Sequence, residues 1–294
     1  MTGLLPSTLR ALEAGIQSGD HLGAQLYVNR GGEVIANVAV GEASSGVPLT
    51  TGHVMLWMSA GKPITAIAIA SLVGKELLRL DTRVADLVPG FGAGGKEEIR
   101  LEHLLTHTAG FRSADALPES LVHEERITRI CESPIEAGWK LGEKAGYQIS
   151  SSWDILGEII QRVTGQSASN YCHTVIFDPL GMEKTWIGIP ETDQAGLSIA
   201  PVHITSQSPA RPHPTLNRPA WIAAERPGSN ARGPVSSLAR FYEHLNHACH
   251  DRRTTLPVSN ALVREFVARR RIGLFDHTFK HTMDWALGFA VNSN

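Results

Sequence analysis

The feature that most constrains the fold is an apolar stretch that begins just after Ser59 and Lys62. Residues 64–78 have the sequence ITAIAIASLVGKELL, and almost every side chain up to residue 73 is apolar. A helix built from such residues has no polar face to turn toward water, so it is normally buried in the middle of a protein. The sequence therefore predicts a central buried helix with Ser59 at its start.

Composition limits the classes of protein to consider. With 294 residues, 42% hydrophobic and 19% charged, the chain suits one large globular domain or two that share a core. A net charge of −2 gives no support for nucleic acid or an anionic membrane as partner. The N-terminus lacks a secretory pattern, and we find no stretch suited to spanning a bilayer. Three widely spaced cysteines match no zinc pattern and favour reduced thiols, so we expect a cytoplasmic protein.

The N-terminal segment has the pattern of a helix followed by a hairpin. Residues 6–18 have helical spacing of their leucines and isoleucine. Two alternating runs, AQLYVNR and EVIANVAVG, then flank a turn at Gly31 and Gly32. Such runs around glycines predict a β-hairpin.

The rest of the chain shows helices and one long aperiodic region. Residues 100–190 are predicted to be mainly helical, most clearly at 155–160, whereas 189–235 are rich in Pro, Ser and Gly and predict a long loop region. Residues 236–245 predict a helix capped by one of its serines. The segment from Trp285 has the pattern of a strand at its beginning.

Ser59-Ala60-Gly61-Lys62 is the one Ser-x-x-Lys in the sequence. On a helix, residues three apart lie on one face with their Cβ atoms about 5–6 Å apart. A serine nucleophile needs a neighbour that accepts its proton, and a lysine can do so when burial and a helix N-terminus lower its pKa. The alternative is an N-cap serine beside a lysine that extends to solvent.

The surrounding motifs follow one another in a recognisable order. They are LeuTrpMetSerAlaGlyLysProIleThrAla, GluLeuLeuArgLeuAspThrArgValAlaAspLeuValPro, LeuLeuThrHisThrAlaGlyPhe, GlyTyrGlnIleSerSerSerTrpAspIleLeuGlyGluIleIle and ProLeuGlyMet. From about residue 20 to the end, this series resembles the serine β-lactamase and penicillin-binding-protein superfamily. Within it, the chain looks most like the class C and family VIII esterase branch.

The resemblance assigns catalytic roles to three residues. Ser59 matches the serine that is acylated, Lys62 the motif lysine, and Tyr147 the tyrosine of the second motif. In the family this tyrosine works with the lysine to move the proton from serine to leaving group, and a phenol beside a cationic lysine is expected to have a lowered pKa. Ile149 replaces the usual asparagine of Tyr-x-Asn, which weakens the case for β-lactam recognition.

His107, in ThrHisThr, raises the alternative of a Ser-His pair. In the family this segment is structural, so we expect His107 to pack beneath the site. The sequence has no Gly-x-Ser-x-Gly elbow, which would be the signature of an α/β-hydrolase.

The family's third motif would follow the segment TrpAlaLeuGlyPhe at 285–289, and the sequence ends before it. In the family that strand supplies one oxyanion N–H, the amide of the serine being the other. Loss of one such donor costs ~10²–10³ in rate. The resemblance thus implies a member truncated at its C-terminus, with an incomplete sheet and with catalytic activity in doubt.

Two other patterns are weaker. Residues 90–96, GFGAGGK, match a phosphate-binding loop in part, but Pro89 precedes them where a strand is needed, so a surface loop is expected. His244, His247 and His250 recur along one helix without a carboxylate, which favours a solvated helix end over a metal site.

Together these features predict an α+β protein of the β-lactamase/transpeptidase type, with a helical lobe and an α/β lobe that carries an antiparallel sheet. Residues 1–51 and 236–294 would form the sheet lobe, and 52–235 the mainly helical lobe. Ser59 would lie in the cleft between them.

The expected activity is that of a serine hydrolase forming an acyl-enzyme, most suited to small carboxylic esters, with a small ester or amide as its partner molecule. No metal or organic cofactor is implied, and the oligomeric state is open. An acyltransferase of the same family is the first alternative. The second is a catalytically impaired homologue that acts at most as a binding module.

Overall fold

The computed structural model describes residues 5–118, 120–206 and 209–292. Its N-terminal part is the predicted helix and hairpin: α1 (Pro6–Ser18), β1 (Gly23–Arg30) and β2 (Glu33–Ser44). β1 and β2 pair antiparallel, and β3 (Val47–Pro48) adds to the other side of β2. Gly31 and Gly32 form the turn with φ of 65° and 93°, a conformation that only glycine adopts without strain.

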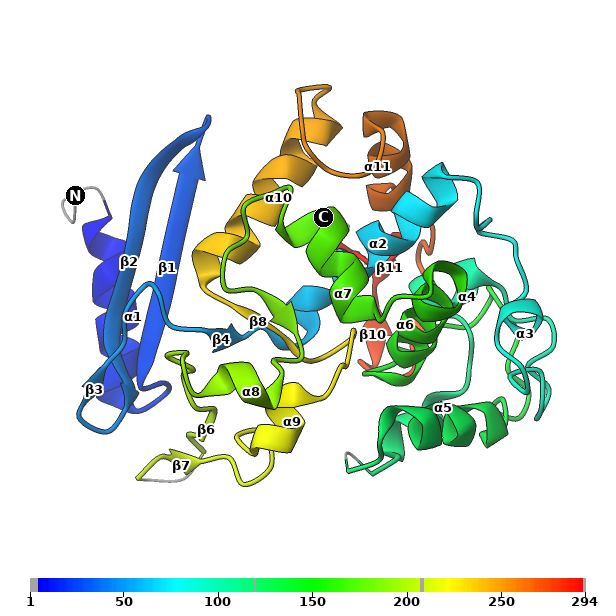
Figure 1. The fold of residues 1–294 in the computed structure, drawn as a ribbon, viewed down its shortest axis with the longest axis horizontal. Coiled ribbons are helices and arrows are strands. Elements are labelled where there is room, and N and C mark those ends of the chain that lie inside the picture. The colour runs from blue at the N-terminus through cyan, green and yellow to red at the C-terminus, as the bar shows by residue number, and fades with distance from the viewer. Residues whose placement is uncertain (1–4, 119, 207–208, 293–294) are drawn as a thin grey trace.

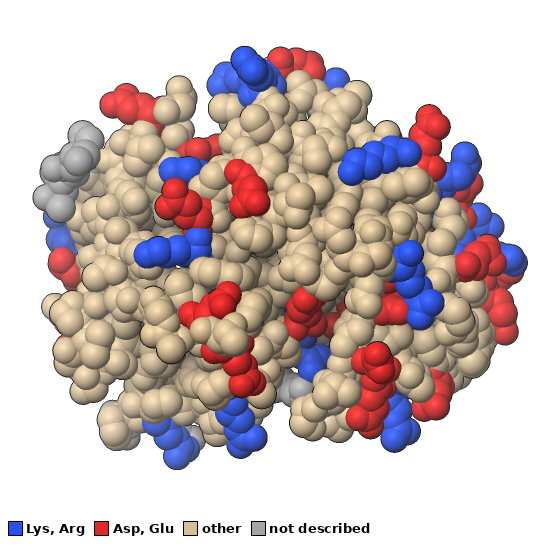
Figure 2. All heavy atoms as spheres, in the orientation of Figure 1, with Lys and Arg blue, Asp and Glu red and all other residues tan. Residues whose placement is uncertain are grey.

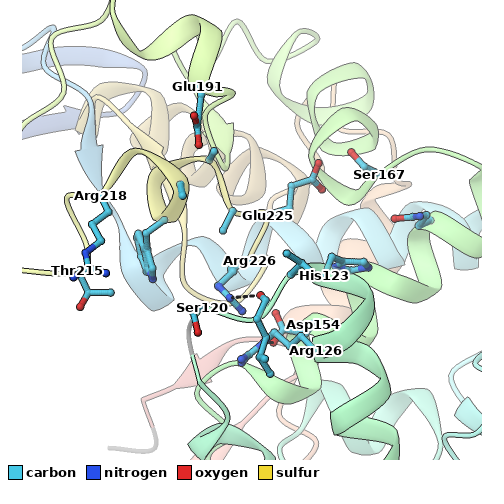
Figure 3. A pocket seen from close by; sticks show the side chains of 17 residues that line it. Ser120, His123, Arg126, Asp154, Ser167, Glu191, Thr215, Arg218, Glu225 and Arg226 are labelled. Atoms are coloured by element: carbon cyan, nitrogen blue, oxygen red, sulfur yellow. Dashed lines mark hydrogen bonds and ion pairs between the residues drawn. The ribbon is translucent and has the colours of Figure 1, made fainter.

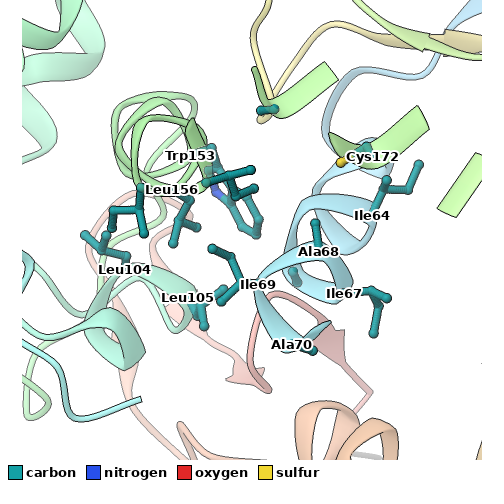
Figure 4. Packing of buried hydrophobic residues seen from close by; sticks show 14 of the residues in the cluster. Ile64, Ile67, Ala68, Ile69, Ala70, Leu104, Leu105, Trp153, Leu156 and Cys172 are labelled. Atoms are coloured by element: carbon teal, nitrogen blue, oxygen red, sulfur yellow. The ribbon is translucent and has the colours of Figure 1, made fainter. Parts of the chain in front are cut away.

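The central helix is α2 (Lys62–Gly74), and it is buried as predicted. Ile64, Ile67 and Ile69 have no exposed surface. α2 packs against α6 (Ser151–Thr164), α7 (Ala168–Cys172) and α11 (Asn260–Val267). Figure 4 shows these isoleucines within a cluster that also contains Leu104, Leu105, Trp153, Leu156 and Cys172. Since each fully buried side chain of this kind contributes about 1.5–3 kcal/mol, α2 holds the helices of this region together.

Helices dominate the chain from α2 to residue 190, which includes the range 100–190 that was predicted to be mainly helical (Figure 1). Besides α6 and α7 it contains α3 (Val84–Leu87), α4 (Leu101–Leu105), the 3₁₀-helix η3 (Arg112–Ala116), α5 (His123–Glu132) and the π-helical segment η4 (His173–Phe177). α6 ends where Gly165 takes a left-handed conformation, φ 72°, which is the common way for a helix to stop.

The prediction of a loop throughout 189–235 was wrong in part. This region contains α8 (Glu191–Gln194), β6 (His203–Ile204), β7 (Arg211–Pro212), α9 (Pro219–Ala223) and β8 (Ala231–Gly233). β8 is the middle strand of a three-stranded sheet, between β4 (Met55–Leu56) and β5 (Trp186–Ile187). Elements of two to five residues are too short to produce a periodic pattern, so the sequence could not reveal them.

After β8 come α10 (Val235–Cys249), α11, β9 (Phe275–Asp276), β10 (His281–Thr282), β11 (Asp284–Trp285) and β12 (Ala290–Val291). α10 lies beside β1, where the Tyr27 hydroxyl donates to Glu243 Oε1 at 3.0 Å. The predicted serine cap of α10 was wrong. Pro234 is at the N-cap, and the hydroxyl of Ser237 donates to the Glu183 carbonyl instead.

Acidic and basic side chains are interspersed on the face shown in Figure 2, so this face carries no patch of a single charge sign. Within the described ranges, no helix is both long and apolar enough to cross a membrane. Lys96 of the glycine-rich segment is fully buried and donates to the carbonyls of Ala93, Cys131 and Ser133, so its role is structural. His244 contacts Thr254, and His250 contacts the carbonyl of Asn246.

Candidate active site

Ser59 lies in a short 3₁₀-helix, η2 (Met58–Gly61), between β4 and the start of α2. The residue before η2, Trp57, is fixed to β8 by two hydrogen bonds. Its backbone N–H donates to the Ala231 carbonyl at 2.9 Å, and its indole Nε1 donates to the Gly233 carbonyl at 2.8 Å. Met58 has a left-handed φ of 50°, which is uncommon for a residue with a side chain. The β-sheet thus sets where Ser59 is presented.

Gly61 shows why the motif contains a glycine. A Cβ placed on Gly61 would lie 2.3 Å from the Cβ of Ala231. No real Cβ makes so close a contact, and both atoms belong to fixed elements, so any other residue here would push β8 away from α2. The close approach of β8 brings the segment just before it, residues 226–228, within reach of Lys62.

The Lys62 side chain is 2% exposed, and its Nζ has three oxygen partners. They are Ser59 Oγ at 3.0 Å, the Ile149 carbonyl at 2.7 Å and the Gly228 carbonyl at 2.6 Å. A neutral amine has two N–H groups and one lone pair. The two carbonyls can accept both N–H groups, and the lone pair then faces Ser59 Oγ. This arrangement suits a base that removes the serine proton.

Burial lowers the pKa of Lys62 from 10.5 to about 7, and the carboxylates of Asp115 and Asp154 partly oppose that effect. The direction agrees with the prediction from the sequence. At neutral pH a substantial fraction of Lys62 is therefore the uncharged amine that proton transfer requires.

Tyr147 approaches Ser59 from the other side. Its hydroxyl donates to Ser59 Oγ at 2.6 Å, and its backbone N–H donates to the Asp276 carboxylate at 3.1 Å. Its ring packs against His107 and Phe279, with centroid distances of 4.6 Å and 4.7 Å. Tyr147 is thus held by two ring contacts and by its backbone.

The expectation of a lowered pKa for Tyr147 was wrong. Burial raises the pKa of its phenol above 10.0, and the charges of Asp115 and Asp276 add to this, while the bond to Ser59 partly opposes it. Because the pKa of Lys62 is about 7, about half of it is uncharged at pH 7, and the cation that was expected to stabilise a phenolate is only partly present. Tyr147 is therefore a proton donor near neutral pH, rather than a base.

Ile149 contributes its backbone to the site and not its side chain. The side chain is 53% exposed, whereas the carbonyl accepts from Lys62. The Ile149 N–H donates to the Asp115 carboxylate at 2.8 Å. The position of the expected asparagine thus presents an apolar side chain to solvent.

His107 lies beneath the site, as the structural interpretation predicted. It is fully buried, and its Nδ1 accepts the backbone N–H of Gln148 at 3.0 Å. Its carbonyl accepts the N–H of Gly146, also at 3.0 Å. These bonds hold the residues on either side of Tyr147, so His107 positions the tyrosine.

A cleft of about 340 Å³ opens beside Ser59. Its lining is mostly apolar and includes Pro63, Tyr242, Phe279, Met283, Trp285, Phe289 and Ala290.

Comparison with known proteins decides the family. The family model described as "Beta-lactamase" matches residues 9–293. The chain belongs to the β-lactamase family. Among curated relatives, "Penicillin-binding protein 4" of Amycolatopsis lactamdurans is 28% identical over 84% of this chain and 65% of its own length. "Esterase EstB" of Burkholderia gladioli is 27% identical over 65% of this chain and 52% of its own length. The chain thus spans between half and two thirds of the length of these relatives.

Solved structures confirm the predicted fold. A family VIII carboxylesterase matches 98% of this chain and 81% of its own, with a TM-score of 0.81 at 23% identity. The octameric penicillin-binding protein homologue from Pyrococcus abyssi matches 99% and 66%, with a TM-score of 0.81 at 21% identity. The fold is therefore of the β-lactamase and penicillin-binding-protein type, with helices and antiparallel sheets.

The sequence predicted Ser59, Lys62 and Tyr147 as site residues. The structure brings the three together, with Lys62 Nζ and the Tyr147 hydroxyl both within hydrogen-bond distance of Ser59 Oγ. It missed the Gly228 carbonyl, which accepts from Lys62 Nζ, and the carboxylates of Asp115 and Asp276, which accept the backbone N–H groups of Ile149 and Tyr147. Each lies far along the chain from the residue it contacts, so no local spacing could have identified it. The expectation that the sequence lacks the third motif, and with it one oxyanion N–H, is not tested by the described residues and stays a prediction.

Proposed function

We propose that the protein is a serine hydrolase that forms an acyl-enzyme on Ser59, acting on small carboxylic esters. The observation that carries this proposal is the environment of one atom. Ser59 Oγ has Lys62 Nζ at 3.0 Å and the Tyr147 hydroxyl at 2.6 Å. The pKa of Lys62, at about 7, gives that nitrogen a lone pair at neutral pH.

In the proposed reaction, Ser59 Oγ attacks the ester carbonyl carbon while its proton passes to Lys62 Nζ. The new O–C bond gives a tetrahedral intermediate. When the bond to the alcohol oxygen breaks, Tyr147 donates its proton to the departing alkoxide, and Lys62 returns a proton to the phenolate. In the second half of the reaction, water attacks the carbonyl carbon of the acyl-enzyme, and the same groups transfer the protons in the reverse order. The bond to Ser59 Oγ then breaks and the acid is released.

Three observations favour an ester over a β-lactam. The relative named Esterase EstB matches 65% of this chain. The cleft of about 340 Å³ is lined mainly by aromatic and aliphatic side chains. Ile149 has no amide with which to bind the amide of a β-lactam side chain, and its side chain is exposed. An apolar acyl group of modest size suits these walls, and a cytoplasmic location remains part of the proposal.

The test is the intact mass of purified protein after exposure to a fluorophosphonate. One adduct is expected on the wild type and on Ser45→Ala, an exposed serine in a turn, and none on Ser59→Ala. p-Nitrophenyl esters of increasing acyl length and a chromogenic cephalosporin then compare the substrate classes. No adduct on folded wild-type protein would overturn the hydrolase proposal and leave a binding module.

A further inference from the structure

A second and larger cavity, of about 590 Å³, lies away from the Ser59 cleft and shares no lining residue with it. It is lined by the segment before α5, by α6 and by the chain around α9 (Figure 3). In Figure 2 the visible face is hollowed between the α9 and α5 regions, and side chains of both charges reach this hollow. The volume is within the usual range for a small-molecule site, about 300–1,000 Å³.

Arg126 of α5 provides a charged donor at this cavity. Its Nε donates to Asp154 Oδ2 at 2.5 Å, and its Nη2 donates to Ser150 Oγ at 2.6 Å. Its Nη1 is buried and has no hydrogen-bond partner among the residues described, and the residue is only 4% exposed. A buried charged N–H without an acceptor is rare and costly, so an acceptor from outside the chain would stabilise it.

Trp221 of α9 is a second hydrogen-bond donor in the lining of the cavity. Its indole Nε1 also lacks a partner within the described part of the chain, and the residue is 7% exposed. The acceptors at the cavity are in use, since Asp154 binds Arg126 and Glu225 Oε2 accepts the backbone N–H of Ser169 at 3.1 Å. The unsatisfied groups are thus donors, which calls for a ligand that accepts.

The charged side chains that line the cavity balance, since Arg126, Arg218 and Arg226 stand against Asp154, Glu191 and Glu225, so an anion meets no net negative charge there. Glu191 is exposed to water, and the Asp154 carboxylate is paired with Arg126. His123 is paired with Glu158 at 2.8 Å. The other lining residues supply an apolar surface: Leu121, Val122, Ala220, Ala223 and Ala224.

We propose that this cavity binds an organic monocarboxylate with a short alkyl chain. The carboxylate would accept from Arg126 Nη1, and the alkyl chain would lie along the apolar side chains beside Trp221. Because Nη1 is itself buried, binding includes a small rotation of the neighbouring lining side chains, for which a cavity of about 590 Å³ leaves room. The proposal does not depend on Ser59 being reactive.

The cavity also shares two chain segments with the Lys62 site. Ser150, which accepts from Arg126, follows Ile149, whose carbonyl holds Lys62. Arg226, which donates to the Leu121 carbonyl at 3.3 Å, precedes Gly228 by two residues. A carboxylate has the chemistry of the acid that ester hydrolysis releases, so under the proposed function the occupant resembles the product.

Isothermal titration of sodium octanoate into Ser59→Ala protein tests the proposal without any hydrolysis. We expect one site per chain, with 1-octanol and inorganic phosphate each binding at least about tenfold more weakly, since the first lacks the charge and the second the chain. Equal binding of either control, or no octanoate binding below the concentration at which it forms micelles, would overturn it.

Variants locate the site. Arg126→Gln is expected to weaken octanoate binding at least about tenfold. The double variant Arg126→Gln with Asp154→Asn, which leaves no unpaired carboxylate, keeps the test valid if the single variant unfolds. Ala224→Phe fills the cavity without touching the ion pair and is expected to abolish binding, whereas Phe279→Ala in the Ser59 cleft is expected to leave it unchanged. The reverse pattern would place octanoate in the Ser59 cleft and reject the second site. Fluorophosphonate labelling, measured separately, reports on the hydrolase proposal alone.

Discussion

The Asp115 carboxylate accepts the backbone N–H of Ile149 at 2.8 Å, and the Ile149 carbonyl in turn accepts from Lys62 Nζ at 2.7 Å. The same carboxylate accepts the N–H groups of Ser150 and Ser151, at 3.0 Å and 2.8 Å. Three N–H groups that open α6 are therefore satisfied by one side chain from a distant 3₁₀-helix. Asp115 fixes the carbonyl that orients the lysine, and its charge acts on the same lysine.

Asp115→Asn removes the charge of Asp115 and keeps part of its hydrogen bonding. The one amide oxygen can still accept from Ser150 and Ser151, as Oδ1 does, but the acceptor of the Ile149 N–H is lost, and so is a charge that raises the pKa of Lys62. The midpoint of the fluorophosphonate labelling rate against pH should therefore move to lower pH. Asp115→Ala should in addition lower the free energy of unfolding by about 1 kcal/mol or more, because it removes the acceptor.

Asp81→Asn is the matched control for this experiment, since Asp81 is an exposed carboxylate paired with Arg79. It should leave the labelling midpoint where it is in the wild type. An Asp115→Asn profile that coincides with that of Asp81→Asn would show that Asp115 acts on α6 alone.

Lys62→Met is predicted to change how stability depends on pH. The pKa of Lys62 is about 7 in the folded protein against 10.5 ordinarily. Between these values the unfolded chain binds a proton that the folded protein does not, so this lysine makes stability rise with pH, by at most about 1.4 kcal/mol per pH unit. Urea unfolding across this range should show a shallower rise for Lys62→Met. Identical slopes would mean that Lys62 stays charged when folded.

The motifs predicted the parts of the fold and site that depend on local pattern. The apolar run after Ser59 identified α2, and alternation around Gly31 and Gly32 identified the hairpin. The triplet of Ser59, Lys62 and Tyr147 came from its resemblance to the family. The division into residues 1–51 with 236–294 and residues 52–235 stays a prediction.

What the sequence could not supply is the set of backbone carbonyls and distant carboxylates. The Gly228 carbonyl reaches Lys62 because β8 lies against Gly61, a relationship between residues about 170 positions apart. The sign of the Tyr147 pKa shift likewise depends on burial and on Asp115 and Asp276, which only tertiary structure brings near. The residue types that carry the chemistry and the direction of the Lys62 pKa shift were predictable, but the direction of the Tyr147 pKa shift was not.

Tyr147→Phe keeps the ring contacts and removes the hydroxyl that donates to Ser59 Oγ. Loss of a positioned proton donor should slow ester turnover by about 10² or more. Because burial raises the pKa of Tyr147, the wild-type rate should rise through about pH 7 with Lys62 and should not fall again until well above neutral pH. Tyr27→Phe, which alters a hydroxyl on β1, should retain the full rate. Full turnover in Tyr147→Phe would remove the tyrosine from the mechanism.

His107→Asn tests whether the buried histidine supports Tyr147 or takes part in chemistry. Burial, then the charges of Lys62 and Arg271, hold the pKa of His107 well below 6.5. The unfolded chain therefore takes up a proton below pH 6.5 that the folded protein does not, and wild-type stability should fall as pH falls through that range. Asparagine tolerates the left-handed φ of 57° and can accept from Gln148, but it does not titrate.

His107→Asn should lose about 1–3 kcal/mol of stability at neutral pH, because ring packing is lost. Its free energy of unfolding should then fall less steeply than that of the wild type as the pH is lowered. Urea midpoints at several pH values would measure this, with the exposed His281→Asn as control. Labelling of Ser59 at neutral pH should be slowed but present in His107→Asn, since Lys62 and the Tyr147 hydroxyl remain. Complete loss of labelling in a folded variant would instead make His107 a catalytic residue, and the Ser-Lys mechanism would have to be replaced by a Ser-His one.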